Sequence, residues 1–418
     1  MKILKVQGGN KLKGTVRISG AKNSAVALIP AAILCDEVVK ISNVPDISDM
    51  DALSDIISYL GGSYKRKEHD VVYVASNEMV NKIIPENLST KLRASYYFMG
   101  ALLGKYKKAE IYYPGGCTIG ERPIDLHLKG FEKLGVKVKE TGNKILLQAE
   151  ELKGSNIYLD FASVGATINI MLAAVKAKGI TIIENAAKEP EIVNVANFLN
   201  LMGAKIQGAG TDIIKIKGVD YLHSCHQEVI PDRIEAATYI MIGACLSSDL
   251  TITNIIPKHL HALTQKLYEM GVDLQINEDS IHVTNKNKLK AVKVKTFVYP
   301  GFPTDMQQII ASLMTQAKGI SIINETIFEN RFQNLYELQR MGAVIKVEGN
   351  KGYISGPVKL KGTSITATDL RAAAGLLLAA LVAEGETIIN NTDYILRGYE
   401  DVVGKLEKIG AKVKLIEI

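Results

Sequence analysis

A glycine-rich segment carries the residue whose chemistry is easiest to assign. The stretch YPGGCTIGERPIDLH, residues 113–127, holds Cys117 and, five positions later, Arg122. Glycine and proline on both sides of the cysteine favour an exposed, mobile loop. A nearby cation or helix N-terminus can lower the pKa of a thiol, which then acts as an acid or a nucleophile. His127 is the one base-like residue in the segment, so a Cys–His hydrolase pair is only weakly indicated, and an incidental loop thiol is the alternative.

Charged and polar residues also recur where a strand is expected to meet a helix. Helix N-termini bind anions, and a nearby Lys or Arg adds charge-assisted hydrogen bonds to carboxylate or phosphate. Taken singly, each such residue could be a helix cap or a surface ion pair. Basic residues at five equivalent junctions favour an anion-binding protein instead. The five basic residues meant are Lys22, Arg93, Arg122, Arg371 and Arg397. The other residues noted at these junctions are Asn23, Ser163, Gly165, Asp232, Arg233, Asp305, Ile327 and Asp369.

The remaining motifs indicate neither a metal nor a cofactor. His223, Cys225 and His226 form half of a zinc-ligand pattern, but no second Cys or His cluster follows at suitable spacing, so a polar loop is expected. No P-loop or Rossmann glycine pattern is present. Cys35 and Cys245 lie in or beside apolar stretches and are expected to pack there.

The composition of the chain indicates the class of protein to which these residues belong. The chain has 418 residues, a formal net charge of +6 and 47% apolar residues, as in a globular protein of two or three domains. The charge is too small to indicate nucleic acid but suits anionic small substrates. No signal-peptide pattern or membrane-length apolar run is present, and four cysteines make no disulfide framework. We therefore expect a cytoplasmic protein with no membrane association and no obligate protein partner.

A repeated pattern indicates how these residues are positioned. Six times, an amphipathic stretch ends in a glycine that is followed by alternating apolar and polar residues, with spacings of 68 to 74 residues. Each glycine is predicted to follow a helix C-terminus, and each following segment to form a strand. The six glycines are Gly61, Gly135, Gly203, Gly271, Gly342 and Gly410.

A second repeated block precedes each of these glycines. It reads as an Ala- and Gly-rich helix, apolar on nearly all sides, running into a β-branched strand. Helices of this kind are buried on several sides. Most are preceded by a short strand, as in GTVRISG before the first of them. The pattern predicts six α/β repeats of about 70 residues with helices inside and sheets outside. A solenoid scaffold without chemistry is the alternative.

The junction motifs resemble those of the UDP-N-acetylglucosamine 1-carboxyvinyltransferase (enolpyruvyl transferase) family, in order along nearly the whole chain. This resemblance implies an inside-out α/β barrel with six βαβαββ repeats in two lobes of three. It implies one lobe of residues 22–229, a second of residues 1–21 and 230–418, and an active site in the cleft between them. The motifs are ISGAKNSA, PGGCTIGERPIDLH, SVGAT, NAAKEPEIV, IPDRIE, FPTDMQ, FENRF, ATDLRA and RGYE.

The resemblance also implies an activity. The family transfers the enolpyruvyl group of phosphoenolpyruvate to the 3-hydroxyl of UDP-N-acetylglucosamine and releases phosphate, through a tetrahedral intermediate. This is the first committed step of peptidoglycan synthesis, so roles in cell wall biogenesis, cell shape, division and the cell cycle, and sensitivity to fosfomycin, are implied with it. The family needs no cofactor or metal. The alternatives are 5-enolpyruvylshikimate-3-phosphate synthase on the same fold and a non-catalytic repeat protein that binds nucleotide sugars.

Residue roles carried over from the family fall on the junctions. Cys117 matches the general acid and Asp305 the base that takes the hydroxyl proton, with Lys22 and Arg397 also at the reacting centre. The position of Phe161 holds a lysine in some members, which puts one phosphate contact in doubt. The expected phosphoenolpyruvate contacts are Lys22, Asn23, Cys117, Arg122, Arg371 and Arg397. The expected UDP-N-acetylglucosamine contacts are Asn23, Arg93, Arg122, Pro123, Ile124, Asp125, Leu126, Ser163, Val164, Gly165, Asp305 and Ile327.

Overall fold

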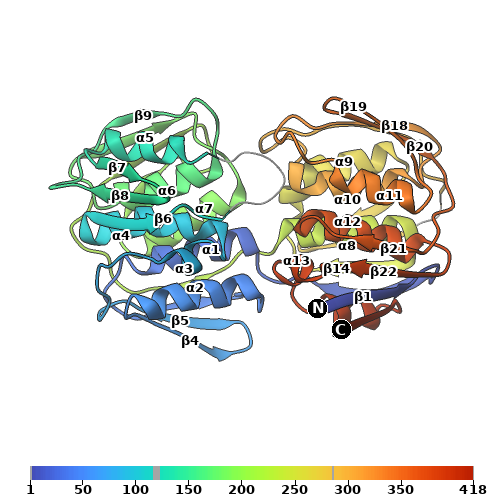
Figure 1. The fold of residues 1–418 in the computed structure, drawn as a ribbon, viewed down its shortest axis with the longest axis horizontal. Helices are drawn as coiled ribbons and strands as arrows, with labels where there is room; N and C mark the ends of the chain where they lie inside the picture. Colours follow the sequence, from blue (N-terminus) through green and yellow to red (C-terminus); the bar gives the residue numbers. More distant parts are fainter. Residues whose placement is uncertain (1, 116–122, 285–286, 418) are drawn as a thin grey trace. The chain divides into compact units, whose positions relative to one another are not determined.

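The computed structural model describes residues 2–115, 123–284 and 287–417 (Figure 1). These residues form two compact units. The first unit contains residues 20–115 and 123–230, and the second contains residues 2–19 and 231–417. Each unit holds three of the six separate sheets.

The first unit surrounds a group of apolar helices with sheets of order β13-β3-β5-β4, β6-β8-β7 and β11-β12-β10-β9. Its helices are α1 (Lys22–Ala32), α2 (Ser48–Tyr59), α3 (Glu86–Ser89), the 3-10 helix η1 (Arg93–Tyr96), α4 (Tyr97–Tyr106), α5 (Asp125–Lys133), α6 (Val164–Ala174) and α7 (Pro190–Leu201). Its strands are β3 (Val39–Ser42), β4 (Ser63–Glu68), β5 (Val71–Ala75), β6 (Lys108–Tyr112), β7 (Lys137–Thr141), β8 (Lys144–Gln148), β9 (Asn156–Tyr158), β10 (Ile180–Glu184), β11 (Lys205–Gln207), β12 (Ile213–Lys217) and β13 (His226–Glu228).

The second unit has the same design, with sheets of order β21-β22-β1-β23, β15-β16-β14-β2 and β17-β18-β20-β19. Its helices are α8 (Arg233–Leu246), the 3-10 helix η2 (Pro257–Leu260), α9 (His261–Glu269), α10 (Thr304–Met314), α11 (Gln333–Arg340), α12 (Leu370–Val382), α13 (Asp393–Leu396) and α14 (Val402–Lys408). Its strands are β1 (Lys2–Gln7), β2 (Leu12–Arg17), β14 (Ser247–Thr253), β15 (Asp273–Ile276), β16 (Ser280–Thr284), β17 (Lys293–Lys295), β18 (Gly319–Asn324), β19 (Val344–Glu348), β20 (Lys351–Gly356), β21 (Ser364–Thr366), β22 (Glu386–Asn390) and β23 (Lys412–Glu417).

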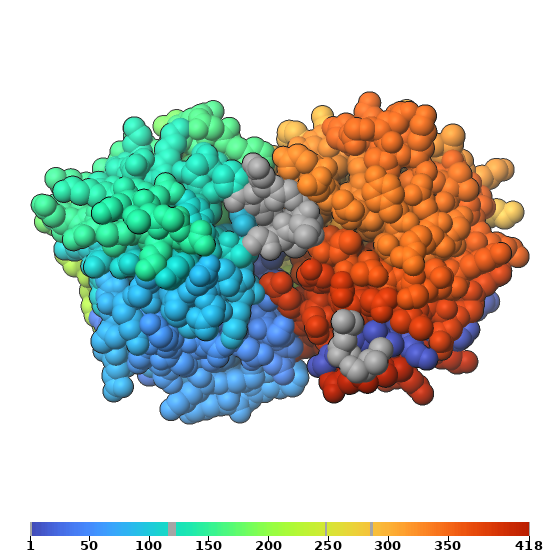
Figure 2. All heavy atoms as spheres, in the orientation of Figure 1, coloured from blue at the N-terminus to red at the C-terminus, as the bar shows by residue number. Residues whose placement is uncertain are grey.

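Helices occupy the centre of each unit and sheets its outside, as the repeats predict. In the second unit α8, α10 and α12 contact one another, and each also packs on a sheet (Figure 1). In the first unit α4 contacts both α1 and α6. The strands around residues 63–75 and 137–148 form part of the outer surface of the first unit in the space-filling view (Figure 2). The βαβαββ order is complete, for example, in β17–α10–β18–α11–β19–β20.

Small residues allow the central helices to approach closely. Of the 13 residues of α12, 11 are buried, which a helix apolar on all sides requires. A Cβ at Gly375 in this helix would lie 2.5 Å from the backbone oxygen of Gln308 in α10. Gly100 in α4 has the same relation to Asn169 in α6, where the distance would be 2.2 Å. Glycine at these two positions therefore sets the spacing of the helix pairs that carry the junctions.

The six repeated glycines take the conformation predicted for them. All six have φ between +84° and +102°, the left-handed region that ends a helix at little cost for glycine. A strand begins two positions after each glycine: β4, β7, β11, β15, β19 and β23. This prediction of helix ends and strand starts is confirmed.

The strand predicted before the first central helix belongs to the other unit. GTVRISG lies largely in β2, which pairs in parallel with β14 of the second unit, while β13 pairs in parallel with β3 of the first. Backbone hydrogen bonds fix the chain on each side of this exchange. Ala21 N–H donates to Ile230 O at 2.7 Å in the first unit, and Asp232 N–H donates to Ser19 O at 2.9 Å in the second. The strand predicted at GTVRISG is therefore present as β2, and it pairs within the sheet of the second unit.

The sheet of the second repeat also departs from the pattern. It has three strands, and the place of its first strand is taken by a single parallel bridge between Ile84 and Ile111. The termini of the chain share one sheet, because β1 pairs with β23. In the part of the chain that the structure describes, no helix is both long and apolar enough to cross a membrane.

Candidate functional site

Asp305 lies between two buried arginines in the second unit. It is the second residue of α10, so its side chain projects from the first turn of a central helix. Its Oδ1 accepts a hydrogen bond from Arg331 at 2.9 Å, and its Oδ2 accepts two from Arg371 at 3.1 and 3.2 Å. The Asp305 side chain is 27% exposed, whereas those of Arg331 and Arg371 are 2% and 5% exposed. Two buried guanidiniums thus hold the carboxylate of a partly exposed aspartate.

Burial and nearby anionic groups act in opposite directions on Arg371. Burial, the largest single effect, works against the charged guanidinium, but Asp305, Tyr399 and Asp232 together outweigh it, so the pKa of Arg371 is raised above its ordinary value. Arg371 also lies 5.9 Å from the ring centroid of Tyr399. Burial raises the pKa of Tyr399 to about 12, so the phenol is neutral beside this cation.

The backbone of α12 positions Arg371. Asp369 is the N-cap of that helix, and its Oδ1 accepts from the backbone N–H groups of Arg371 and Ala372 at 2.8 and 3.0 Å. Its Oδ2 accepts from the Gln308 amide at 2.9 Å, which ties the start of α12 to α10. Asp369 is therefore a helix cap, which is the alternative to a ligand-binding role that the sequence analysis gave for each junction residue.

A buried glutamate organises the loop that follows β18. Glu325 is 3% exposed, and its carboxylate accepts from the hydroxyls of Thr296 and Thr304, both at 2.9 Å. The same carboxylate accepts from the backbone N–H of Ile327 at 2.8 Å. Thr304 in turn accepts from Arg331 at 3.3 Å. The Glu325 carboxylate thus accepts hydrogen bonds from Ile327, an expected sugar contact, and from Thr304, the residue before Asp305.

Arg397 follows the short helix α13 in the same unit. It is half-buried, and its backbone N–H donates to Asp393 O at 3.2 Å. Tyr399, two residues further on, accompanies Arg371 as described above and exchanges a hydrogen bond of 2.8 Å with Thr238. The second unit therefore supplies Asp305, Arg371, Arg397 and Ile327 of the expected set.

Lys22 begins the first central helix of the other unit. Its Nζ lies 2.6 Å from Oδ2 of Asp49 in α2, and the two side chains are 13% and 3% exposed. A buried carboxylate thus holds the ammonium at the N-terminus of α1, beside half-buried Asn23. Asp49 was not among the residues expected from the sequence.

Three expected nucleotide-sugar segments meet around Asn169 in the first unit. The Asn169 amide donates to the backbone oxygen of Tyr96 at 2.8 Å and lies 2.9 Å from Nδ1 of His127. The rings of Tyr96 and His127 stack edge to face with centroids 4.9 Å apart. A Cβ at Gly165 would lie 2.9 Å from the Tyr96 hydroxyl and 3.0 Å from the imidazole. This packing brings together η1 with half-buried Arg93, the start of α5 and the start of α6.

Two helix N-termini belong to this cluster. Ser163 caps α6, its Oγ accepting from the backbone N–H of Ala166 at 3.3 Å, and Val164 follows it as the first helical residue. Ile124 is the N-cap of α5. Around it, Pro123 and Asp125 are exposed and Leu126 is half-buried. Neighbouring helix N-termini concentrate partial positive charge, which suits a phosphorylated ligand.

His127 is a structural residue of this cluster rather than a base. It is 4% exposed. Burial, with the nearby charge of Arg93, lowers the pKa of His127 to about 3, so the imidazole is neutral. A buried histidine of this kind does not support the hydrolase pair of Cys117 and His127 that the sequence weakly indicated.

Some sequence predictions lie elsewhere or outside the described residues. Cys117 and Arg122 both fall in 116–122 and so are not described. Phe161 is 50% exposed, just before Ser163. Cys35 is fully buried, as expected, and Cys245 lies within α8. Within the described ranges, no group of three or more His, Cys, Asp or Glu side chains could hold a metal ion.

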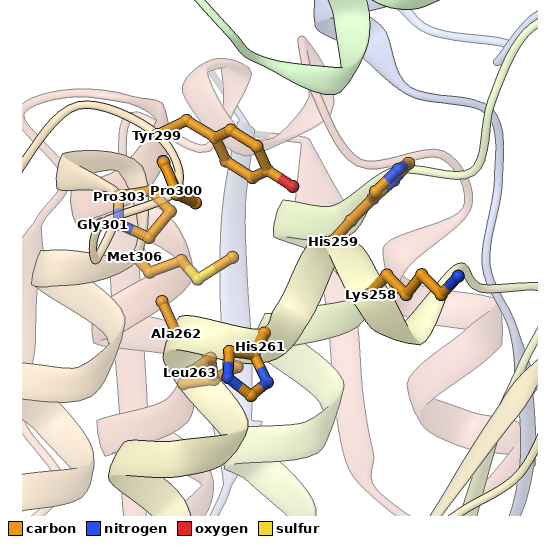
Figure 3. Close-up of a pocket in the computed structure, with 10 residues that line it drawn as sticks. All are labelled: Lys258, His259, His261, Ala262, Leu263, Tyr299, Pro300, Gly301, Pro303 and Met306. Carbon is orange, nitrogen blue, oxygen red and sulfur yellow. The ribbon is translucent and has the colours of Figure 1, made fainter. Parts of the chain in front are cut away.

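A small cavity lies next to the helix that carries Asp305. Its volume of about 40 Å³ suits water rather than a nucleotide sugar. Figure 3 shows Tyr299 and His259 above it and Met306 at its wall. The cavity is lined by Lys258, His259, His261, Ala262, Leu263, Tyr299, Pro300, Gly301, Pro303 and Met306, none of them an expected substrate contact.

The residues missed from the sequence are the partners of the expected ones. Arg331 lies within the FENRF motif, and Glu325 lies three residues before that motif. The motif was the available signal, but the sequence does not show that Arg331 reaches back 26 positions to Asp305. Lys22 and Asp49 are likewise distant in sequence and adjacent in space.

Comparisons with known proteins agree on one group of relatives. The model of the family described as EPSP synthase (3-phosphoshikimate 1-carboxyvinyltransferase) matches residues 6–406. UDP-N-acetylglucosamine 1-carboxyvinyltransferase 2 of Listeria monocytogenes is 54% identical over 98% of this chain and 96% of its own length. The protein of the same name from Bacillus cereus is 52% identical over 99% of this chain and 96% of its own length.

A solved structure shows the same fold. The enolpyruvyl transferase NikO from Streptomyces tendae has a TM-score of 0.90 and 28% identity, covering 99% of this chain and 98% of its own.

Proposed function

The chain belongs to the EPSP synthase (3-phosphoshikimate 1-carboxyvinyltransferase) family of enolpyruvyl transferases, and on that premise we propose that it transfers the enolpyruvyl group of phosphoenolpyruvate to the 3-hydroxyl of UDP-N-acetylglucosamine, releasing phosphate. The observation that carries this proposal is the 52–54% identity, over at least 98% of the chain, to proteins named for that reaction. The reaction would supply the first committed step of peptidoglycan synthesis and so support the cell wall, cell shape and division. It would take place in the cytoplasm and be blocked by fosfomycin.

The proposed chemistry is addition followed by elimination. The sugar 3-oxygen attacks C2 of phosphoenolpyruvate and loses its proton, while C3 gains a proton. The tetrahedral product then loses phosphate from C2 and a proton from C3, which restores the enol ether. Two proton-transfer groups on different elements are needed, a base for the hydroxyl and an acid for C3. We assign the base to Asp305 and the acid to Cys117.

The position of Asp305 supports its assignment as the base. Its side chain is 27% exposed, and each carboxylate oxygen accepts from a buried guanidinium. A base held in one orientation aligns with its proton without reorganising in the transition state. Arg371, which donates two hydrogen bonds to Asp305, then serves phosphoenolpyruvate through its charge and by holding the base.

The cations at the junctions suit the binding of two polyanionic substrates. Lys22, Arg122 and Arg397 are proposed to bind the phosphate that leaves, and Arg93 a further anionic group. Lys22 meets the requirement of preorganisation, because buried Asp49 holds its ammonium at a helix N-terminus. The cluster around Asn169, with the N-termini of α5 and α6, is proposed to bind the nucleotide part through residues 123–126 and 163–165.

Release of phosphate tests the proposal. The protein should release phosphate only when phosphoenolpyruvate and UDP-N-acetylglucosamine are both present, with each omitted in turn as the control. The family's name gives shikimate 3-phosphate as a second acceptor to test. If phosphoenolpyruvate releases phosphate with shikimate 3-phosphate but not with UDP-N-acetylglucosamine, the result would favour the synthase for which the family is named. Binding of UDP-N-acetylglucosamine without turnover would favour a non-catalytic binding protein.

A further inference from the structure

A groove in the second unit contains none of the residues assigned to the proposed reaction. It lies between α9 and one face of the sheet β17-β18-β20-β19. Its volume is about 600 Å³, which falls within the range of about 300–1,000 Å³ that is typical of sites for small organic ligands. The groove is therefore large enough to hold a ligand of its own.

The register of the strands places six side chains on the solvent-facing side of this sheet. Residues two apart in a strand point to the same side, and Val294 and Ile323, which alternate with them, are buried on the other side. The pairing of β17, β18 and β20 arranges the six in two rows across the strands. One row is Lys293, Ile322 and Tyr353, and the other is Lys295, Asn324 and Lys351.

The charged side chains that line the groove are all cationic. Four lysines line it, and among the described residues no aspartate or glutamate does. Lys266 of α9 is paired with Glu269 at 2.9 Å. Lys293, Lys295 and Lys351 are exposed and form no ion pair with any residue that the structure describes. Opposite charges commonly face each other across strands, so three unpaired ammoniums on one face suit an anion that comes from outside the chain.

Asn324 supplies a second polar feature between two of these lysines. In register it lies between Lys295 and Lys351. Its Oδ1 is buried and has no hydrogen-bond partner within the described part of the chain. Glu348, which faces Lys351 in register, bonds Lys346 at 2.6 Å instead. Buried polar atoms are nearly always hydrogen-bonded, so the Asn324 amide is placed to bond water or a ligand in the groove.

The remaining wall of the groove is largely apolar. Phe302 and Val294 are 5% and 2% exposed, and Ile322 and Tyr353 are half-buried. An apolar wall with a few convergent polar groups is the usual composition of a small-molecule site. The aromatic ring of Tyr353 also offers a surface for a flat ligand.

We propose that this groove binds an organic polyanion of nucleotide size, whose negative groups bond the three unpaired lysines and whose apolar body lies against Tyr353. The carboxylates of Glu269 and Glu348 border the lysines on two sides, which favours a small ligand over a continuous nucleic-acid strand. This inference does not rest on the proposed function.

Calorimetry with ATP as the probe tests the role of the lysines. UDP-N-acetylglucosamine is present at saturation, so that ATP does not report on the proposed substrate site. In Lys295→Gln/Lys351→Gln the Kd for ATP should rise about 10- to 100-fold, because two charge-assisted contacts are lost. The matched control is Lys5→Gln/Lys359→Gln, which removes the same charge from exposed ion pairs outside the groove; its Kd should stay within about threefold of the wild type.

An isosteric variant tests the place between the lysines. Asn324→Asp keeps the size of the side chain but puts a carboxylate between Lys295 and Lys351. It should weaken ATP at least as much as the double lysine variant, because the new charge pairs with the lysines and repels the ligand. Tripolyphosphate, which has no apolar body, should bind more weakly than ATP.

Methyl NMR locates the bound probe without reading turnover. The Ile322 signal, assigned through Ile322→Val, should shift with ATP, and that of Ile182 in β10 of the first unit should not. An unmoved Ile322 signal, or equal Kd values in the double lysine variant and its control, would overturn the proposal. Equal affinity for ATP and tripolyphosphate would overturn an organic ligand. A single-stranded oligonucleotide that binds more tightly than ATP through the same lysines would replace it with a nucleic-acid surface. Failure of the proposed function would leave all of these readouts unchanged.

Discussion

At the scale of single residues, Asp305 combines two properties that a base seldom has together. Two guanidiniums neutralise it, yet 27% of its side chain stays exposed. Cations on both oxygens weaken a carboxylate as a proton acceptor. Such a base suits a hydroxyl that becomes acidic only as its oxygen bonds to carbon, because the proton then moves late in the addition step.

Asp305→Asn should separate chemistry from binding. The amide retains the size of the carboxylate but cannot take the hydroxyl proton, so kcat should fall about 10²- to 10⁴-fold. Binding of UDP-N-acetylglucosamine, measured by calorimetry, should stay within about tenfold. The melting temperature should also fall, because two buried guanidiniums lose their counter-ion. The control is Asp160→Asn at the exposed pair with Lys129, and near-normal turnover in Asp305→Asn would reject the assignment.

His127 makes the stability of the first unit depend on pH. Burial lowers its pKa to about 3, whereas the unfolded chain protonates a histidine near 6.5. Between these values the unfolded state binds a proton that the folded state does not. The stabilising contribution is therefore complete above about pH 6.5 and is lost as the pH falls toward 3.

His127→Gln should flatten this dependence. Denaturant unfolding between pH 7 and 4 should show a smaller loss of free energy of unfolding in the variant than in the wild type. The glutamine can still accept from Asn169, which limits the structural damage. Exposed His223, changed to Gln, is the control and should keep the wild-type slope. Equal slopes for His127→Gln and the wild type would contradict the assignment of His127 as a buried neutral side chain.

At the scale of elements, the glycines that end the helices could be predicted because their cause is local. A helix end needs a left-handed residue, and the next segment alternates as a strand. The pairing of β2 with β14 and of β13 with β3 does not follow from that local pattern, although the lobe bounds implied by the family resemblance place both strands in these units. Either strand satisfies the same local pattern, and only long-range pairing decides which sheet it joins. Arg331 and Asp49 escaped prediction for the same reason, since their partners are remote in sequence.

Gly342 isolates the cost of that left-handed conformation. Its φ is +98°, and a Cβ would meet nothing closer than the Lys359 backbone oxygen at 3.8 Å. Gly342→Ala should therefore destabilise by strain alone, about 1–2 kcal/mol, and lower the melting temperature by roughly 2–8 °C. Gly342→Asn should lose less, because asparagine tolerates this region. Melting curves that place alanine at or above asparagine would show that the backbone, not the side chain, relaxes.

At the scale of the whole molecule, the expected contacts of one ligand are divided between the two units. Asn23, Arg93 and the segment 163–165 belong to the first, and Asp305 and Ile327 belong to the second. Among the residues that the structure describes, the chain passes between the units at 19–20 and at 230–231. Each crossing is followed or preceded by a strand that stays in its own unit, because β2 pairs with β14 in the second unit and β13 pairs with β3 in the first.

UDP-N-acetylglucosamine should report on this division of contacts, and UDP is its matched control. The sugar carries the hydroxyl that Asp305 is proposed to meet, whereas UDP has only the part assigned to the first unit. The sugar nucleotide should change the radius of gyration in solution scattering and the rate at which fosfomycin labels Cys117, and UDP should change both less. In Asp305→Asn the two ligands should become more alike. Equal effects of UDP and the sugar nucleotide on the wild type would mean that the second unit takes no part in recognising the sugar.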